Sequence, residues 1–278
     1  MGKLKNTNPV RDSENKQIPQ NKQTPLEVTR FKTNQRANKP LTGQISNRAK
    51  NFLLDLFFPK FCLSCGKTGS WLCQDCQAFL KIQEENFCPA CDKLTLNFKT
   101  HKACKGLTKL AGLFWAVDYR NPLVKKLIFK FKYRPFAKEL ARPLTKILIS
   151  HFLLSGVPLT KMDFVLVPIP LTRKRLKWRG FNQAEEIAKE ISRFYQLPLD
   201  NLLIREKERI PQMKIKEPEK RKENIKGVFS CVFPQEVRGK TILLIDDVST
   251  TRATLEEAAK VLKKSGAQEV WAAVVARG

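Results

Sequence analysis

Two adjacent acids follow an apolar run in the segment ILLIDDVSTTRAT, which extends from Ile242 to Thr254. Carboxylates at the end of a buried strand are suited to bind sugar hydroxyls. Backbone N–H groups of a loop at a helix N-terminus are suited to bind a phosphate. The apolar run, the acid pair, a loop rich in small hydroxyl residues and a helix-like segment occur here in that order. The segment therefore predicts a pocket for a phosphate and a ribose.

This segment resembles the phosphoribosyl-pyrophosphate (PRPP) signature of type I phosphoribosyltransferases. The resemblance implies that Asp246 and Asp247 hold the ribose hydroxyls, and that the following loop surrounds the 5′-phosphate through backbone N–H groups and hydroxyls. Mg²⁺ would bridge the oxygens of the PRPP itself, with few direct protein ligands. The implied PRPP-binding residues are Asp246, Asp247, Val248, Ser249, Thr250, Thr251, Arg252, Ala253 and Thr254.

Arg252 departs from that signature, because the family usually has Gly at this position. Gly lets the backbone approach a phosphate closely and adopt a positive φ without penalty. Arg252 either adds a charge-assisted contact to the phosphate or narrows the loop and weakens binding. The sequence leaves both alternatives open.

Cysteine pairs separated by two residues predict a metal-binding module. Two such pairs supply the tetrahedral sulfur set that zinc prefers, and imidazole is an acceptable fourth ligand. With every ligand supplied by protein, the zinc is expected to be structural. Two alternatives stay open: the first cysteine pair joins the third, or His101 is a loop residue and the second site is vestigial. The expected ligands are Cys62, Cys65, Cys73 and Cys76 for one site and Cys88, Cys91, His101 and Cys104 for the other.

The charge of the chain is extreme, with a formal net charge of +26 over 278 residues and a pI near 9.9. Such a surface attracts polyanions, nucleic acid first and anionic membrane second; a merely solvated basic surface is the alternative. No apolar run reaches the roughly 18 residues of a membrane span, and the start of the chain lacks the apolar core of a secretory signal. We therefore expect a cytoplasmic protein with no integral membrane contact.

The pattern along the chain predicts a disordered basic tail at 1–46, a short helix and a zinc-binding module at 47–106, and an α/β domain at 107–278. Strands alternate with helices in the last part, which favours an open, mostly parallel sheet with helices on both faces. The expected strands are Leu113–Val117, Phe164–Val167, Thr241–Ile245 and Val270–Val275. The expected helices are Pro122–Phe131, Phe136–Leu154, Asn182–Tyr195 and Thr254–Lys264.

Three features together resemble the ComF family of competence-related, phosphoribosyltransferase-like proteins: the double zinc module, VPIPLTRKRLKWRGFNQA and IDDVSTTRAT. The resemblance covers about 52–278 and implies a type I phosphoribosyltransferase-like fold. It implies a role in DNA uptake during natural transformation, action on single-stranded DNA, and a competence helicase as partner. Some members carry the name amidophosphoribosyltransferase by similarity.

Arg179 opens the RGFNQ motif that the resemblance rests on, and we expect it to contact a phosphate of PRPP from the loop after the strand at 165–168. The charged stretch 207–226 is expected to form a lid or an insertion. No residue stands out as a general acid or base, and no segment identifies an acceptor. Whether the chain is an enzyme stays open. The alternative function is a PRPP-dependent, amidophosphoribosyltransferase-like enzyme of nucleotide metabolism with an unknown acceptor and no DNA role.

Overall fold

A computed structural model of the chain describes residues 59–96, 98–133, 138–206 and 225–278. The predictions for the tail at 1–46, the short helix at 52–58 and the stretch 207–224 lie outside these residues. None of the described helices has the length and hydrophobicity that crossing a bilayer requires.

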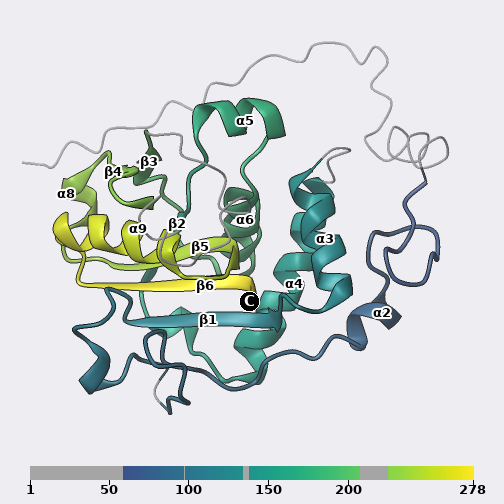
Figure 1. Cartoon of the computed structure of the whole chain (residues 1–278), viewed down its shortest axis with the longest axis horizontal. Helices are drawn as coiled ribbons and strands as arrows, with labels where there is room; N and C mark the ends of the chain where they lie inside the picture. The colour runs from purple at the N-terminus through teal and green to yellow at the C-terminus, as the bar shows by residue number, and fades with distance from the viewer. Residues whose placement is uncertain (1–58, 97, 134–137, 207–224) are drawn as a thin grey trace, which may run out of the picture. The chain divides into compact units, whose positions relative to one another are not determined.

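The described part contains a sheet of four parallel strands in the order β1-β6-β5-β2, which can be followed in Figure 1. A separate antiparallel pair joins β3 to β4. The strands are β1 Gly112–Asp118, β2 Phe164–Pro168, β3 Leu203–Arg205, β4 Phe229–Cys231, β5 Thr241–Ser249 and β6 Glu269–Arg277. The open parallel sheet confirms the predicted fold class.

Helices cover both faces of this sheet, as predicted. The helices of the described residues are α2 Gln74–Ala78, α3 Pro122–Lys132, α4 Ala141–Leu154, α5 Arg173–Arg179, α6 Gln183–Tyr195, α8 Pro234–Val237 and α9 Ala253–Lys264. Of these, α3, α4 and α6 pack on one face and α9 on the other. Short 3₁₀ turns occupy η1 Lys102–Cys104, η2 Lys138–Leu140 and η3 Leu159–Lys161.

The side chains of the central strand β5 divide between two hydrophobic clusters, one on each face of the sheet. Leu243 and Ile245 pack into one cluster with the buried faces of α3, α4 and α6. Ile242 and Leu244 pack into the other cluster with α9 and the β3–β4 pair. Successive side chains of a strand point to opposite faces, so an uninterrupted apolar run is what a strand buried on both faces requires.

Three elements differ from the sequence predictions. The strand β5 continues to Ser249 because its backbone pairs with β6 as far as Arg277, so the acid pair lies within the end of the strand. The helix α4 begins at Ala141 after the turn η2, where a helix from Phe136 was expected. The basic segment after β2 is the helix α5, capped by the Thr172 hydroxyl at its start and by left-handed Gly180 at its end, and is therefore not a loop.

The cysteine-rich module lies against the outer strand β1. The backbone N–H of Gln83 donates to the carbonyl of Ala116, and that of Thr100 donates to the carbonyl of Ala111. A Cβ at Gly112 would lie 2.4 Å from the carbonyl oxygen of Phe98 and from the Trp271 ring. This close approach explains why β1 begins with glycine, and it brings the module to the edge of the sheet.

Candidate functional site

The acid pair lies at the carboxyl end of β5, where ligands bind in open α/β sheets. Asp247 is buried, and its Oδ1 forms an ion pair with Nζ of Lys132 at 2.8 Å. The backbone N–H of Asp247 donates to Oδ1 of Asp246 at 2.8 Å. Lys132 is the last residue of α3. Sequence analysis missed it, because no motif links a lysine to an acid 115 positions later.

The surroundings of Asp246 and Lys132 shift the pKa of both groups. Burial, and then the charge of Asp247, raise the pKa of Asp246 to about 7. Burial opposes the charge on Lys132, but the carboxylates of Asp247 and Asp246 raise its pKa. Lys132 is thus held as a cation beside a carboxyl that changes its charge near neutral pH.

The predicted phosphate loop follows directly. Ser249 is buried, and its Oγ lacks a hydrogen-bond partner among the described residues. Thr250 is exposed, and Thr251 and Thr254 are partly buried. The helix α9 begins at Ala253 and points its N-terminus at this loop. A free buried hydroxyl next to a helix N-terminus fits an anionic ligand.

Arg179 ends α5 and lies close to the same place. Its Nη1 donates to Oε1 of Gln183 at 2.8 Å, and its guanidinium lies 5.7 Å from the Tyr133 ring centroid. Its Nε is buried without a hydrogen-bond partner in the described part of the chain. The positive charge of Arg179 acts on Lys132. The structure therefore brings Arg179, Lys132 and the acid pair together from three separate elements.

Arg252 adopts the backbone conformation that the family's glycine would adopt, with φ of 60°. Its Nη1 donates to Oδ1 of Asp92 at 2.8 Å. Asp92 belongs to the cysteine-rich module, so the side chain of Arg252 contacts this module. Sequence analysis considered only a phosphate contact or a narrowed loop for Arg252, and it missed Asp92.

The eight predicted metal ligands form two groups in the order of the sequence, not interleaved. In each group the four ligand atoms lie within 4.8 Å of one another. The groups are Cys62, Cys65, Cys73 and Cys76, and Cys88, Cys91, His101 and Cys104.

The ligand environment of both groups fits structural zinc. Nδ1 of His101 lies 3.3 Å from Sγ of Cys91, and its Nε2 lies 2.9 Å from the carbonyl oxygen of Leu94. A carbonyl that accepts from Nε2 leaves the Nδ1 lone pair for a metal. Although burial opposes ionisation, backbone N–H groups lower the pKa of Cys62 to about 6 and that of Cys88 to about 7. Burial and the neighbouring thiols raise the pKa of Cys104 to about 11, as expected for sulfurs crowded together. Thiolates are the form that binds zinc.

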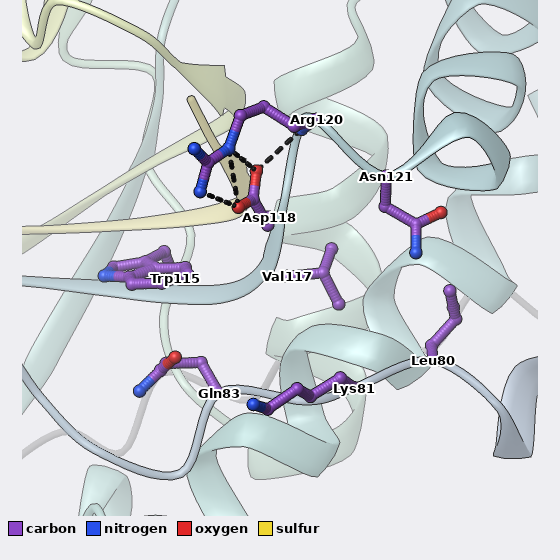
Figure 2. Close-up of a pocket in the computed structure, with 8 residues that line it drawn as sticks. All are labelled: Leu80, Lys81, Gln83, Trp115, Val117, Asp118, Arg120 and Asn121. Atoms are coloured by element: carbon purple, nitrogen blue, oxygen red, sulfur yellow. Dashed lines mark hydrogen bonds and ion pairs between the residues drawn. The ribbon is translucent and has the colours of Figure 1, made fainter.

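A pocket of about 300 Å³ lies elsewhere, at the end of β1, as Figure 2 shows. Arg120 folds back on Asp118, and its hydrogen bonds lower the pKa of that carboxyl. The lining residues are Leu80, Lys81, Gln83, Trp115, Val117, Asp118, Arg120 and Asn121. None of the sequence-predicted site residues lines this pocket.

Two domain families match parts of this chain. Residues 53–107 match the model of a double zinc ribbon domain, and residues 177–278 match that of a phosphoribosyl transferase domain. Competence protein ComFC of Bacillus subtilis is 30% identical over 212 residues, which are 72% of this chain and 81% of that protein. The chain belongs to the ComF family.

Two further relatives support this assignment. DNA utilization protein YhgH of Escherichia coli is 28% identical over 222 residues, which are 72% of this chain and 95% of that protein. Competence protein F of Haemophilus influenzae is 35% identical over 112 residues, 40% of this chain, and the match spans about half (48%) of that relative. This ComF-family protein thus joins a double zinc ribbon to a phosphoribosyltransferase-like domain.

Proposed function

We propose that this ComF-family protein binds PRPP with Mg²⁺ and acts on single-stranded DNA during DNA uptake, in the cytoplasm. The arrangement of residues at the carboxyl end of β5 supports PRPP binding. There Asp246 and Asp247 stand next to the unpartnered hydroxyl of Ser249 and the N-terminus of α9. The acid pair would hold the ribose hydroxyls, and the loop amides and hydroxyls would hold the 5′-phosphate.

The cations beside the acid pair would bind the pyrophosphate group of PRPP. Lys132 and Arg179 face the site from α3 and α5, where a pyrophosphate group attached to the ribose needs positive charge. Mg²⁺ would supply further charge neutralisation through the oxygens of PRPP.

Calorimetric titration of PRPP and Mg²⁺ into the zinc-loaded protein tests the first part. We expect saturable binding that the double variant Asp246→Asn/Asp247→Asn weakens by roughly tenfold or more, since hydrogen bonds to charged groups contribute about 1.5–3 kcal/mol each. The matched control is Asp118→Asn, an acid at the carboxyl end of β1, which β6 separates from β5, and this variant should bind PRPP as the wild type does. Normal PRPP binding by the double variant would show that the pocket is assigned wrongly.

The second part of the proposal is supported by a basic, aromatic surface on α3 and α5. The Phe129 ring lies 4.7 Å from that of Tyr133, which lies 5.9 Å from that of Trp178. Phe129 is 58% exposed and Trp178 is 45% exposed. Nζ of Lys130, also on α3, lies 4.5 Å from the centroid of the Trp71 ring of the cysteine-rich module.

Charge and shape suit this surface to a single strand. An open groove of about 490 Å³ is lined by Leu63, Tyr119, Lys125, Lys126, Phe129 and Lys130. Exposed Arg173, Lys174 and Lys177 of α5 add charge beside Trp178. Unpaired bases stack on exposed aromatic rings while cations contact the backbone, whereas duplex DNA has no free base faces to stack. The competence helicase stays a proposed partner, which only the family membership supports.

Fluorescence anisotropy with a labelled oligothymidylate tests this surface. We expect the variant Phe129→Ala/Trp178→Ala to bind more weakly by roughly 30-fold or more, since stacking contributes about 1–3 kcal/mol per base and two rings are removed. Phe194→Ala is the matched control, because Phe194 of α6 is also 58% exposed and its ring lies 4.9 Å from that of its neighbour Tyr195. Equal affinity of the double variant and the control would place the strand elsewhere.

A transferase without a DNA role is the second candidate. The observation in its favour is the pKa of Asp246 near 7, since a general acid or base works best when its pKa lies near the operating pH. PRPP binding together with no measurable affinity for oligothymidylate would favour this function over the first.

A further inference from the structure

The two zinc knuckles of the ribbon have the same backbone but differ at one residue. In the first, the N–H of Gly66 donates to the carbonyl of Cys62 at 3.0 Å, and φ of Gly66 is 77°. In the second, the N–H of Asp92 donates to the carbonyl of Cys88 at 3.0 Å, and φ of Asp92 is 58°. Gly adopts a positive φ without penalty, and aspartate adopts it less readily than Gly but more readily than most other residues. The knuckle therefore accepts either residue, and aspartate adds a side chain that can make contacts outside the knuckle.

The partner of Asp92 has the same unusual backbone. Arg252, the residue before α9, has a φ of 60° and pairs with Asp92 at 2.8 Å. The side chain of Arg252 is 22% exposed and that of Asp92 is 50% exposed, so this ion pair lies at the surface with its guanidinium partly buried. Two non-glycine residues in left-handed conformation, one beside a zinc ligand and one in the predicted phosphate loop, are thus joined by their side chains.

Arg277 is a second cationic partner of Asp92, beside Arg252. Its Nη2 donates to the same Oδ1 of Asp92 at 2.5 Å, and its guanidinium lies 5.7 Å from the centroid of the Trp115 ring. Arg277 ends β6 and is the strand neighbour of Ser249, which precedes the loop. Asp92 therefore connects to the loop from both sides: through Arg252 on the α9 side and through Arg277 on the β5 side.

We propose that Asp92 is a positioning residue for the phosphate loop. By pairing with Arg252 and Arg277, it holds the left-handed backbone at 252 that a glycine would adopt unaided. The second zinc knuckle in this way sets the geometry of the loop in the other domain. The effect on ligand affinity rests on the proposed PRPP function, whereas the effect on loop geometry does not.

Titration of PRPP and Mg²⁺ into full-length, zinc-loaded variants tests the effect on affinity. We expect Asp92→Ala to weaken binding by roughly five- to tenfold, at the lower end of coupling between sites. In the Arg252→Gly background the same substitution should change nothing, because glycine supplies the backbone conformation itself. The control is Asp75→Ala, which removes an exposed acid from the first ribbon. Equal losses in both backgrounds would overturn the proposal, since they would show a merely structural role.

Hydrogen exchange of the loop amides at 250–253 provides a readout without PRPP. Asp92→Ala should speed this exchange, and Arg252→Gly should remove the difference between Asp92 and alanine. The zinc content should stay that of the wild type in each variant. A wild type that binds no PRPP, together with the expected exchange pattern, would refute the proposed function and leave the positioning role standing. Unchanged exchange in Asp92→Ala would refute the positioning role.

Discussion

Asp246 shows at the scale of one residue why a motif becomes a site only when it is folded. Asp246 and Asp247 are neighbours in sequence, and burial at the end of β5 makes both charges costly together. The ion pair from Lys132 to Asp247 offsets part of this cost. The proton that remains on Asp246 below about pH 7 follows from this arrangement.

Asp246 is expected to make both ligand binding and stability depend on pH. If the ionised form binds the ribose, PRPP affinity should rise about tenfold between pH 6 and pH 8, because the ionised fraction rises through the pKa near 7. The folded state holds this proton more tightly than the unfolded state, whose pKa lies near 3.8. The free energy of unfolding should therefore fall as pH rises from about 4 to 7.

Asp246→Asn provides the check on this expectation. Calorimetry should show weak binding with little pH dependence, and thermal unfolding at pH 8 should occur at a higher temperature than in the wild type. A wild-type affinity that is constant from pH 6 to 8 would contradict the titration of Asp246 in the binding site.

The zinc ribbon shows at the scale of an element how metal substitutes for a core. The segment from 59 to 107 buries few large apolar side chains, Leu72 and Leu80 among them. Zinc binding supplies the folding free energy of such modules. The ribbon nevertheless does more than fold, since its segments hydrogen-bond to β1 and Asp92 reaches the phosphate loop.

Elemental analysis should find two zinc ions per chain in protein purified without chelator, one for each ligand group. Cys91→Ser should lose about one of them, because three remaining ligands hold zinc less tightly. Cys231→Ser, which changes a cysteine of β4 outside both groups, should lose none. A wild-type zinc content near zero would contradict the ribbon assignment.

The net charge of +26 is a property of the whole molecule. It favours association with a polyanion over long distances, while the aromatic surface on α3 and α5 is proposed to bind the bases. Residues 1–46 carry many lysines and arginines and lie outside the described residues.

Deletion of 1–46 is expected to weaken oligothymidylate binding at low salt, with a smaller loss at higher salt. Each phosphate contact releases counterions, so a chain with fewer contacts has a shallower dependence of affinity on salt. Anisotropy titrations from about 50 to 200 mM salt measure this slope. PRPP binding should be unchanged, which serves as the control for folding. An identical salt slope in both proteins would rule out a role of the segment in DNA binding.

The sequence by itself determined the parallel α/β sheet, the residues of the metal-binding module and the place of the acid pair near the end of a strand. Each of these depends on local signals: an apolar run such as 242–245, cysteines two residues apart, and acids directly after a strand. The fold decided how the eight candidate ligands divide into two groups. The tertiary structure also decided what surrounds the acid pair and its loop. Lys132, Asp92 and Arg277 reach the site from other elements. Their contacts span more than a hundred positions, and only packing around the sheet brings such residues together.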